Sequence, residues 1–130
     1  MFKVSAGTPW TLVCTDEFQK IVEHFRDVMN LALTNEGTPV VDTQFKRYAQ
    51  FTLPGGAVIE VVEPVETLRE LYKGIVYSIT VDDIGSARKE MAQKDVEFVS
   101  PLFDDKNGWG WIYFRSPDGA IWQIQGHLTT

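Results

Sequence analysis

Two polar residues occupy matching positions in two similar segments of the sequence, and their types are those that bind ligands. PGGAVIEVV carries Glu60 and PDGAIWQIQ carries Gln123, and shifting the first segment by 63 positions places one on the other. A carboxylate and an amide at equivalent places in two strands favour a shared binding site. The alternative is a pair of solvated strand faces, because outward residues of half-exposed sheets are commonly polar.

Aromatic side chains gather on one later segment. In WGWIYFR, the pleat of a strand puts Trp109, Trp111 and Tyr113 on one face and the apolar residues between them on the other. Such rings offer stacking surfaces to a flat ligand. Ordinary core packing or a contact between subunits is the competing interpretation.

Sulfur and imidazole ligands are scarce in this chain. Cys14 is the one cysteine, which excludes an internal disulfide and a cysteine-based zinc site. Cys14 is an even number of residues from Trp10 on the first predicted strand, so the two side chains are expected on the same face. We expect its thiol to be buried and inert. His24 lies on a predicted helix and His127 follows the last predicted strand.

The elements that position these residues follow from periodicity and turn signals. Apolar residues at helical spacing after Asp16 predict an amphipathic helix, and alternation predicts strands. The order strand, helix, three strands occurs twice, so we predict an α+β fold built by duplication. The predicted strands cover 9–15, 43–53, 57–63, 75–83, 96–101, 109–115 and 120–125, with helices over 16–33 and 84–95 and a short strand among the turns after residue 35.

The apolar neighbours of Glu60 assign the faces of its strand. If Ile59 and Val61 pack beneath the helix, Val58, Glu60 and Val62 must lie on the opposite face. By the repeat, Ile121, Gln123 and Gln125 take that opposite face in the second copy, with Trp122 and Ile124 in the core.

Bulk composition narrows the class of protein. The 130 residues are 44% hydrophobic and 23% charged, which is typical of a folded domain. A net charge of −6 argues against nucleic-acid and acidic-membrane partners. No run of 18 apolar residues occurs, so we expect a soluble, cytoplasmic protein without membrane association.

Three segments together resemble the vicinal oxygen chelate superfamily, the glyoxalase/bleomycin resistance protein/dioxygenase fold. They are TDEFQKIVEHFRDVMNLAL, PGGAVIEVVEP and FRSPDGAIWQIQG. The resemblance implies one domain over 1–130, made of two tandem βαβββ modules whose curved mixed sheet surrounds a cleft. The modules cover about 8–63 and 74–127, joined by a linker over about 64–73, and a homodimer is expected.

The same resemblance bears on metal binding. The family's ligand positions fall on Trp10, Glu60, Val76 and Gln123. An indole and a valine have no lone pair to donate, and two oxygen ligands are too few for a catalytic metal. We therefore expect neither a metal nor another cofactor.

Three hypotheses for function follow. The first is a metal-free protein that binds a small aromatic or cationic ligand in the cleft. The second is a lyase- or dioxygenase-type enzyme that uses Glu60 as a general base, with a non-standard or absent metal. The third is a structural or regulatory dimer module without a ligand. The expected ligand-binding residues are Trp10, Arg47, Glu60, Trp109, Trp111, Tyr113 and Gln123.

Overall fold

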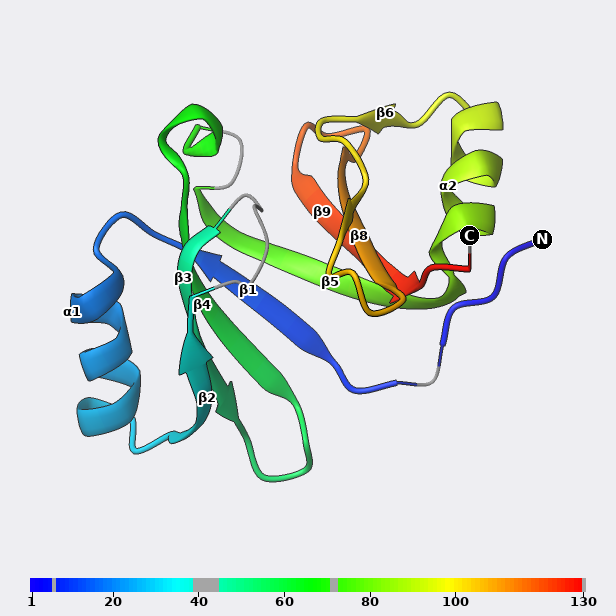
Figure 1. Ribbon diagram of the computed structural model, residues 1–130. Helices are drawn as coiled ribbons and strands as arrows, with labels where there is room; N and C mark the ends of the chain where they lie inside the picture. The colour runs from blue at the N-terminus through cyan, green and yellow to red at the C-terminus, as the bar shows by residue number, and fades with distance from the viewer. Residues whose placement is uncertain (6, 39–44, 71–72, 130) are drawn as a thin grey trace. The chain divides into compact units, whose positions relative to one another are not determined.

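The chain forms two compact units in the computed structural model, which describes residues 1–5, 7–38, 45–70 and 73–129 (Figure 1). One unit is Thr8–Val76. The other joins Tyr77–Thr130 to Met1–Gly7. The first seven residues thus belong to the second unit, which the sequence did not predict.

The Thr8–Val76 unit is a four-stranded sheet with one helix. Its strands are β1 (Trp10–Cys14), β2 (Ala32–Gly37), β3 (Phe45–Thr52) and β4 (Val58–Pro64). The helix α1 (Phe18–Glu23) continues as the π-helical turn η1 (His24–Val28), and a short 3₁₀ turn, η2 (Glu66–Leu68), follows β4. The strand order is β2-β3-β4-β1, with β1 parallel to β4 and the other pairs antiparallel.

The predicted helix over 16–33 is too long. Asn30 has a φ of 57°, the left-handed conformation that ends helices. The Leu31 amide donates back to the Phe25 carbonyl at 2.9 Å, and β2 begins at Ala32. Residues 43 and 44, the start of a predicted strand, lie outside the described residues.

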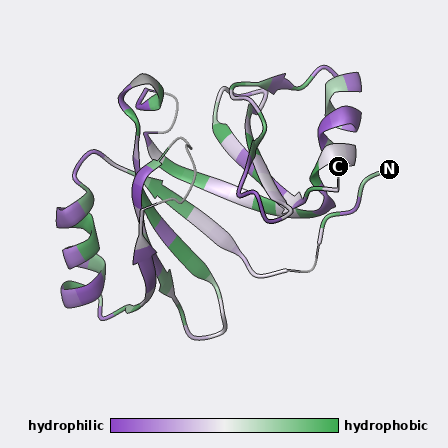
Figure 2. Ribbon diagram, in the orientation of Figure 1, coloured by the Kyte–Doolittle hydropathy of each residue, from purple (hydrophilic) through white to green (hydrophobic). Residues whose placement is uncertain are grey.

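One apolar cluster holds α1 against its sheet. Phe18 and Val22 from the helix pack on Ala49, Phe51 and Val61 from β3 and β4. The prediction that Val61 packs beneath the helix is confirmed. In Figure 2, α1 carries apolar and polar residues in alternating bands, as an amphipathic helix does.

The second unit repeats the topology. Its strands are β5 (Gly74–Asp83, which enters this unit at Tyr77), β6 (Glu97–Phe98), β7 (Phe103–Asp104), β8 (Trp109–Arg115) and β9 (Ile121–His127), and its helix is α2 (Ile84–Gln93). The order is β5-β9-β8-β6, with β7 also pairing β8 and with β5 parallel to β9. The predicted α+β duplication is therefore confirmed.

Two details of this unit differ from the prediction. The short strand β7 was not expected, and β9 runs on to His127, which pairs with Trp109 of β8. His127 therefore belongs to the last strand instead of following it. Gly126 lets this extension lie close against Val81 of β5.

The second core lies between α2 and its sheet. Ile84 and Ala87 of the helix pack on Val81, Ile112 and Ile124 of the strands. The Asp83 carboxylate accepts from the Ser86 amide at 3.0 Å and caps α2. Within the described residues, no helix is both long and apolar enough to cross a bilayer.

Candidate functional site

Glu60 lies in the middle of β4, between one residue of β1 and one of β3. Its partners in the sheet register are Leu12 and Gln50. The Trp10 indole Nε1 donates to one carboxylate oxygen at 3.2 Å, and the Gln50 amide Nε2 donates to the other at 2.9 Å. Two neutral donors therefore fix the orientation of this carboxylate.

The electrostatic surroundings of Glu60 disfavour its charge. Burial raises the pKa of the Glu60 carboxyl above its usual range, and the hydrogen bonds from Gln50 and Trp10 offset only part of this effect. The ion pairs formed among the described residues include none to Glu60. When ionised, the group is a part-buried negative charge without a countercharge.

Cys14 lies on the same face of β1 as Leu12 and is 3% exposed. Burial, with a smaller effect from the Glu60 charge, raises the pKa of the Cys14 thiol to about 12. The thiol therefore stays protonated at neutral pH and is a poor nucleophile.

Arg47 lies apart from Glu60. Its Nε donates to the Glu63 carboxylate at 2.8 Å, and its guanidinium lies 4.5 Å above the centre of the Phe18 ring on the helix side of the sheet. The expectation that Arg47 and Glu60 meet one ligand is not supported by this geometry. Arg47 stabilises the packing of α1 in the structure.

The predicted aromatic face of β8 is present. Ile112 and Phe114 pack toward α2, so Trp109, Trp111 and Tyr113 lie on the opposite face. The Trp111 ring stacks on Phe103, with centroids 6.1 Å apart. The aromatic alternation predicted from the sequence is thus confirmed, although its role in ligand binding stays a prediction.

Gln123 lies on this same face, between Ser78 of β5 and Tyr113 of β8 in the sheet register. It is 4% exposed. The next polar residue on that face, Gln125, is engaged on both sides. Its Oε1 accepts from the Trp109 indole at 3.1 Å, and its Nε2 donates to Ser78 Oγ at 2.9 Å.

These residues do not fit the divalent metal that the family implies. The Trp10 position holds a hydrogen-bond donor directed at Glu60, and the Val76 position holds a buried apolar side chain. Both Glu60 oxygens already accept hydrogen bonds from neighbouring side chains. Among the described residues, no three His, Cys, Asp or Glu side chains come together as metal ligands.

Sequence reasoning missed two residues of these faces, Gln50 and Ser78. A signal for Gln50 exists, because the tight turn at 54–56 folds β3 back on β4 and brings residue 50 opposite residue 60. Ser78 is paired with Gln123 because β5 and β9 are parallel neighbours, although the two residues are 45 positions apart in the sequence. Such a long-range pairing leaves no short-range signal in the sequence.

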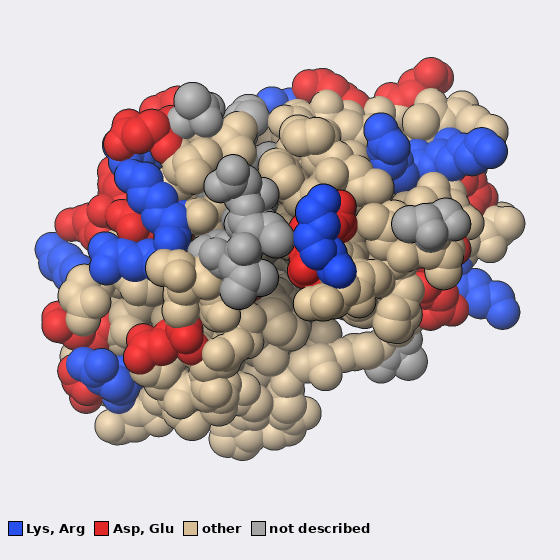
Figure 3. Space-filling model, in the orientation of Figure 1, with Lys and Arg blue, Asp and Glu red and all other residues tan. Residues whose placement is uncertain are grey.

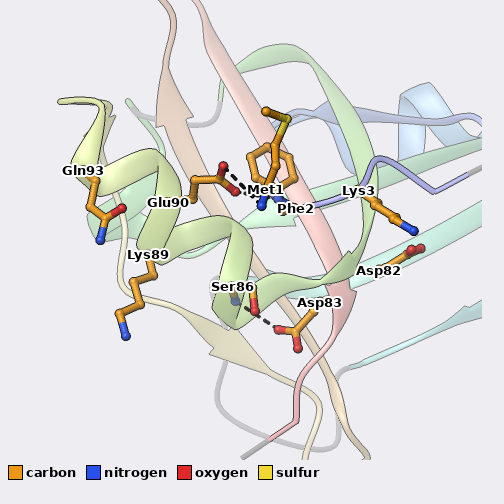
Figure 4. Close-up of a pocket in the computed structure, with 9 residues that line it drawn as sticks. All are labelled: Met1, Phe2, Lys3, Asp82, Asp83, Ser86, Lys89, Glu90 and Gln93. Carbon is orange, nitrogen blue, oxygen red and sulfur yellow. Dashed lines mark hydrogen bonds and ion pairs between the residues drawn. The ribbon is translucent and has the colours of Figure 1, made fainter.

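A separate hollow of about 560 Å³ lies beside α2 (Figure 4). Its carboxylates are largely engaged: Glu90 accepts from the Phe2 amide at 2.5 Å, and Asp83 accepts from Ser86 at the helix start. On the molecular face shown in Figure 3, acidic and basic side chains are interspersed without a broad field of one sign. Neither feature indicates a ligand.

Comparison with known proteins agrees with this architecture. Residues 7–124 match the family model described as Glyoxalase/Bleomycin resistance protein/Dioxygenase superfamily. Comparison with curated proteins found no match. The match to the family model covers most of the chain.

Solved structures share the fold at low sequence identity. A variant of Streptomyces coelicolor methylmalonyl-CoA epimerase, in complex with 2-nitronate-propionyl-CoA, has a TM-score of 0.72 at 13% identity, covering 96% of each chain. Mycobacterium tuberculosis methylmalonyl-CoA epimerase has a TM-score of 0.66 at 17% identity, covering 92% of this chain and 85% of that one. A hypothetical protein from Bacillus halodurans C-125 has a TM-score of 0.71 at 14% identity, covering 99% and 95%. These likenesses show the fold, and together with the family match they establish that the chain belongs to the glyoxalase/bleomycin resistance protein/dioxygenase superfamily.

Proposed function

We propose that this protein is a metal-free binder of small molecules that carry an aromatic ring and a cationic group. The observation that carries the proposal is Glu60, a part-buried carboxylate held by Trp10 and Gln50. Burying a charge without a partner is costly, and a ligand cation would remove that cost. An ammonium group is the simplest complement, because it donates hydrogen bonds and supplies the missing charge.

The indole of Trp10 extends this preference to aromatic amines. Its Nε1 is bonded to Glu60, so its ring lies next to the carboxylate and is itself part-exposed. A cation beside an indole gains from the ring's negative face, and a ligand ring gains from stacking. Trp10 and Glu60 would thus contact the two ends of one ligand.

The absence of suitable donors favours binding without a metal. Of the four positions that the family uses for a metal, Trp10 and Val76 contribute no ligand, and the Glu60 oxygens are committed to neutral donors. Catalysis through a metal-bound ligand has no support in these residues.

Titration of the ¹⁵N-labelled protein with phenethylamine, followed by NMR, tests the proposal. We expect the chemical shift of the Trp10 indole N–H to change on binding, because this group is hydrogen-bonded to Glu60. Glu60→Gln keeps the size of the side chain but removes the charge, and should weaken phenethylamine binding at least about tenfold, the effect of losing a charge-assisted hydrogen bond.

Glu63→Gln is the matched control, since Glu63 lies on the same strand but pairs with Arg47 on the other face. The Glu63→Gln variant should bind phenethylamine with the same affinity as the wild type. If Glu60→Gln and wild type bind the amine equally, or if neither binds it, the proposal is wrong.

A second candidate function rests on the raised pKa of Glu60. A carboxyl whose pKa lies nearer neutrality is better suited to abstract a proton from a carbon acid. The similarity in fold to methylmalonyl-CoA epimerases suggests methylmalonyl-CoA as a probe. If the wild type exchanges the α-proton of methylmalonyl-CoA in deuterated water and the Glu60→Gln variant does not, the result would favour an enzyme over a binding protein.

A further inference from the structure

A cavity of about 310 Å³ lies where β1 and β4 end. These strands are parallel neighbours, so their last residues, Cys14 and Pro64, lie at the same edge of the sheet. The described residues that line the cavity all belong to the Thr8–Val76 unit, and they include neither Glu60 nor the two side chains that donate to it. Its volume is near the lower end for pockets that hold small ligands, roughly 300–1,000 Å³.

Arg69 brings a cation with an unused hydrogen-bond donor to this cavity. Its Nη2 donates to the Glu66 carboxylate at 3.0 Å. Its Nε is buried and has no hydrogen-bond partner among the described residues. Buried N–H groups are almost always hydrogen-bonded, because their removal from water without compensation is unfavourable. An oxygen acceptor bound in the cavity would satisfy this N–H.

Lys73 is a second cation that lines the cavity, and its side chain is exposed. The ion pairs formed among the described residues include none to Lys73. Two carboxylates come from the segment that leads into α1: Glu17, which pairs with Lys20 at 3.5 Å, and the exposed Asp16. Their repulsion disfavours a doubly charged anion more than a singly charged one. The charges therefore favour a monoanion.

Apolar side chains complete the lining of the cavity. Val13 of β1 and Ile21 of α1 are partly buried at the margin of the first core, and Pro64 lies beside them in the lining. Covering such surface with a hydrocarbon chain removes it from water, which is favourable. An anion without an apolar part would leave this surface uncovered.

We infer that this cavity binds a small monocarboxylate with a short apolar chain. The carboxylate accepts from Arg69 and Lys73, and the chain covers Val13 and Ile21. A guanidinium suits this role, because its N–H groups match the geometry of carboxylate oxygens. The ligand group has the opposite charge to the one proposed for Glu60 and contacts different residues, so neither proposal depends on the other.

Titration of the ¹⁵N-labelled protein with hexanoate, followed by NMR, tests the inference. We expect the chemical shift of the Arg69 Nε–H to change on binding. Arg69→Gln should weaken hexanoate binding at least about tenfold, because it removes a charge-assisted hydrogen bond. Lys73→Gln should weaken it by about two- to fivefold, the effect of an exposed ion pair. Acetate, which lacks the chain, should bind at least about tenfold more weakly than hexanoate.

Arg26→Gln is the matched control. It makes the same change at an exposed arginine of η1 that pairs with Asp27 and does not line the cavity. This variant should bind hexanoate with the same affinity as the wild type. Lys73→Gln changes an exposed side chain, so we expect it to fold, and it tests the same cavity if Arg69→Gln proves unstable.

The outcomes separate this inference from the Glu60 proposal. If hexanoate leaves the Arg69 Nε–H unchanged, or binds the Arg69 and Lys73 variants as tightly as the wild type, the inference is wrong even where phenethylamine binds. Tighter binding of inorganic phosphate than of hexanoate, or equal binding of acetate and hexanoate, would refute the assignment to a carboxylate with an apolar chain. If hexanoate binds as described while phenethylamine does not bind, the inference stands and the Glu60 proposal falls.

Discussion

Glu60 shows what sequence can and cannot reveal about a single residue. Alternation along AVIEVVE placed its side chain on the face opposite Val61, and the structure agrees. Its partners were harder to predict. The Gln50 bond depends on the register set by a turn, and the Trp10 bond depends on parallel pairing across 50 residues. Such long-range registers leave no pattern in a single strand.

The pH dependence of stability is the first prediction at this scale. Burial raises the folded-state pKa of the Glu60 carboxyl above its usual range, which is its range in the unfolded chain. Between the unfolded and folded pKa values the folded state binds more protons, so the free energy of unfolding falls as pH rises through that window. Each pKa unit corresponds to about 1.4 kcal/mol.

Glu60→Gln should remove this dependence. We expect the free energy of unfolding of the variant, relative to that of the wild type, to rise with pH across this window, because only the wild-type side chain becomes charged. Urea unfolding of both proteins between about pH 4 and pH 8 measures it. A wild-type advantage that grows with pH would contradict the prediction.

At the scale of elements, helices and most strands were predictable, but their ends were not. Periodicity located α2 and its inward residues Ile84, Ala87 and Met91, all in the second core. The first helix was predicted to run on because apolar residues continue through Leu31 and Leu33. In the structure, the left-handed Asn30 ends the helix, and the two leucines pack on the first core from beyond its end. Apolar spacing alone does not distinguish these two arrangements.

The close approach of β9 to β5 gives the second prediction. A Cβ added at Gly126 would lie 2.2 Å from the Val81 carbonyl oxygen, which is fixed in the backbone of the neighbouring strand. Gly126→Ala should therefore destabilise the fold by about 3 kcal/mol or more, at the upper end of overpacking effects. Urea unfolding measures the loss.

Gly7→Ala is the control for this prediction. A Cβ there would meet its nearest atom, Ser5 Oγ, at an ordinary contact distance of 3.5 Å. We expect its free energy of unfolding to change by no more than about 0.5 kcal/mol, as at most surface sites. Equal effects of the two substitutions would refute the close-approach argument.

At the scale of the whole molecule, duplication was the strongest signal in the sequence. Corresponding strands have the same order in the two units, β1-β4-β3 in the first and β5-β9-β8 in the second. The first two strands of each series, β1 with β4 and β5 with β9, are parallel. The addition of residues 1–5 to the second unit escaped prediction. That segment is held by the bridge between Val4 and Val81, by the bonds of the Met1 amino group and the Phe2 amide to Glu90, and by packing of the Phe2 ring on the second core. No repeat or periodicity in the sequence encodes these contacts.

Each unit has its own apolar core, which leads to the last prediction. Phe51 is 0% exposed in the first core and Ile112 is 1% exposed in the second. Phe51→Ala should cost about 3–5 kcal/mol and Ile112→Ala about 2–5 kcal/mol. Hydrogen exchange should accelerate most in the unit that carries the substitution. Uniform acceleration across both units in each variant would contradict this expectation.

The buried thiol of Cys14 has a practical consequence for spectroscopy. With a pKa of about 12 and 3% exposure, it reacts slowly with maleimides and methanethiosulfonates at neutral pH. The folded wild-type chain therefore behaves as a cysteine-free background. A cysteine introduced at exposed Gln19 on α1, or at exposed Lys89 on α2, would accept a spin label or fluorophore selectively, without removal of the native residue.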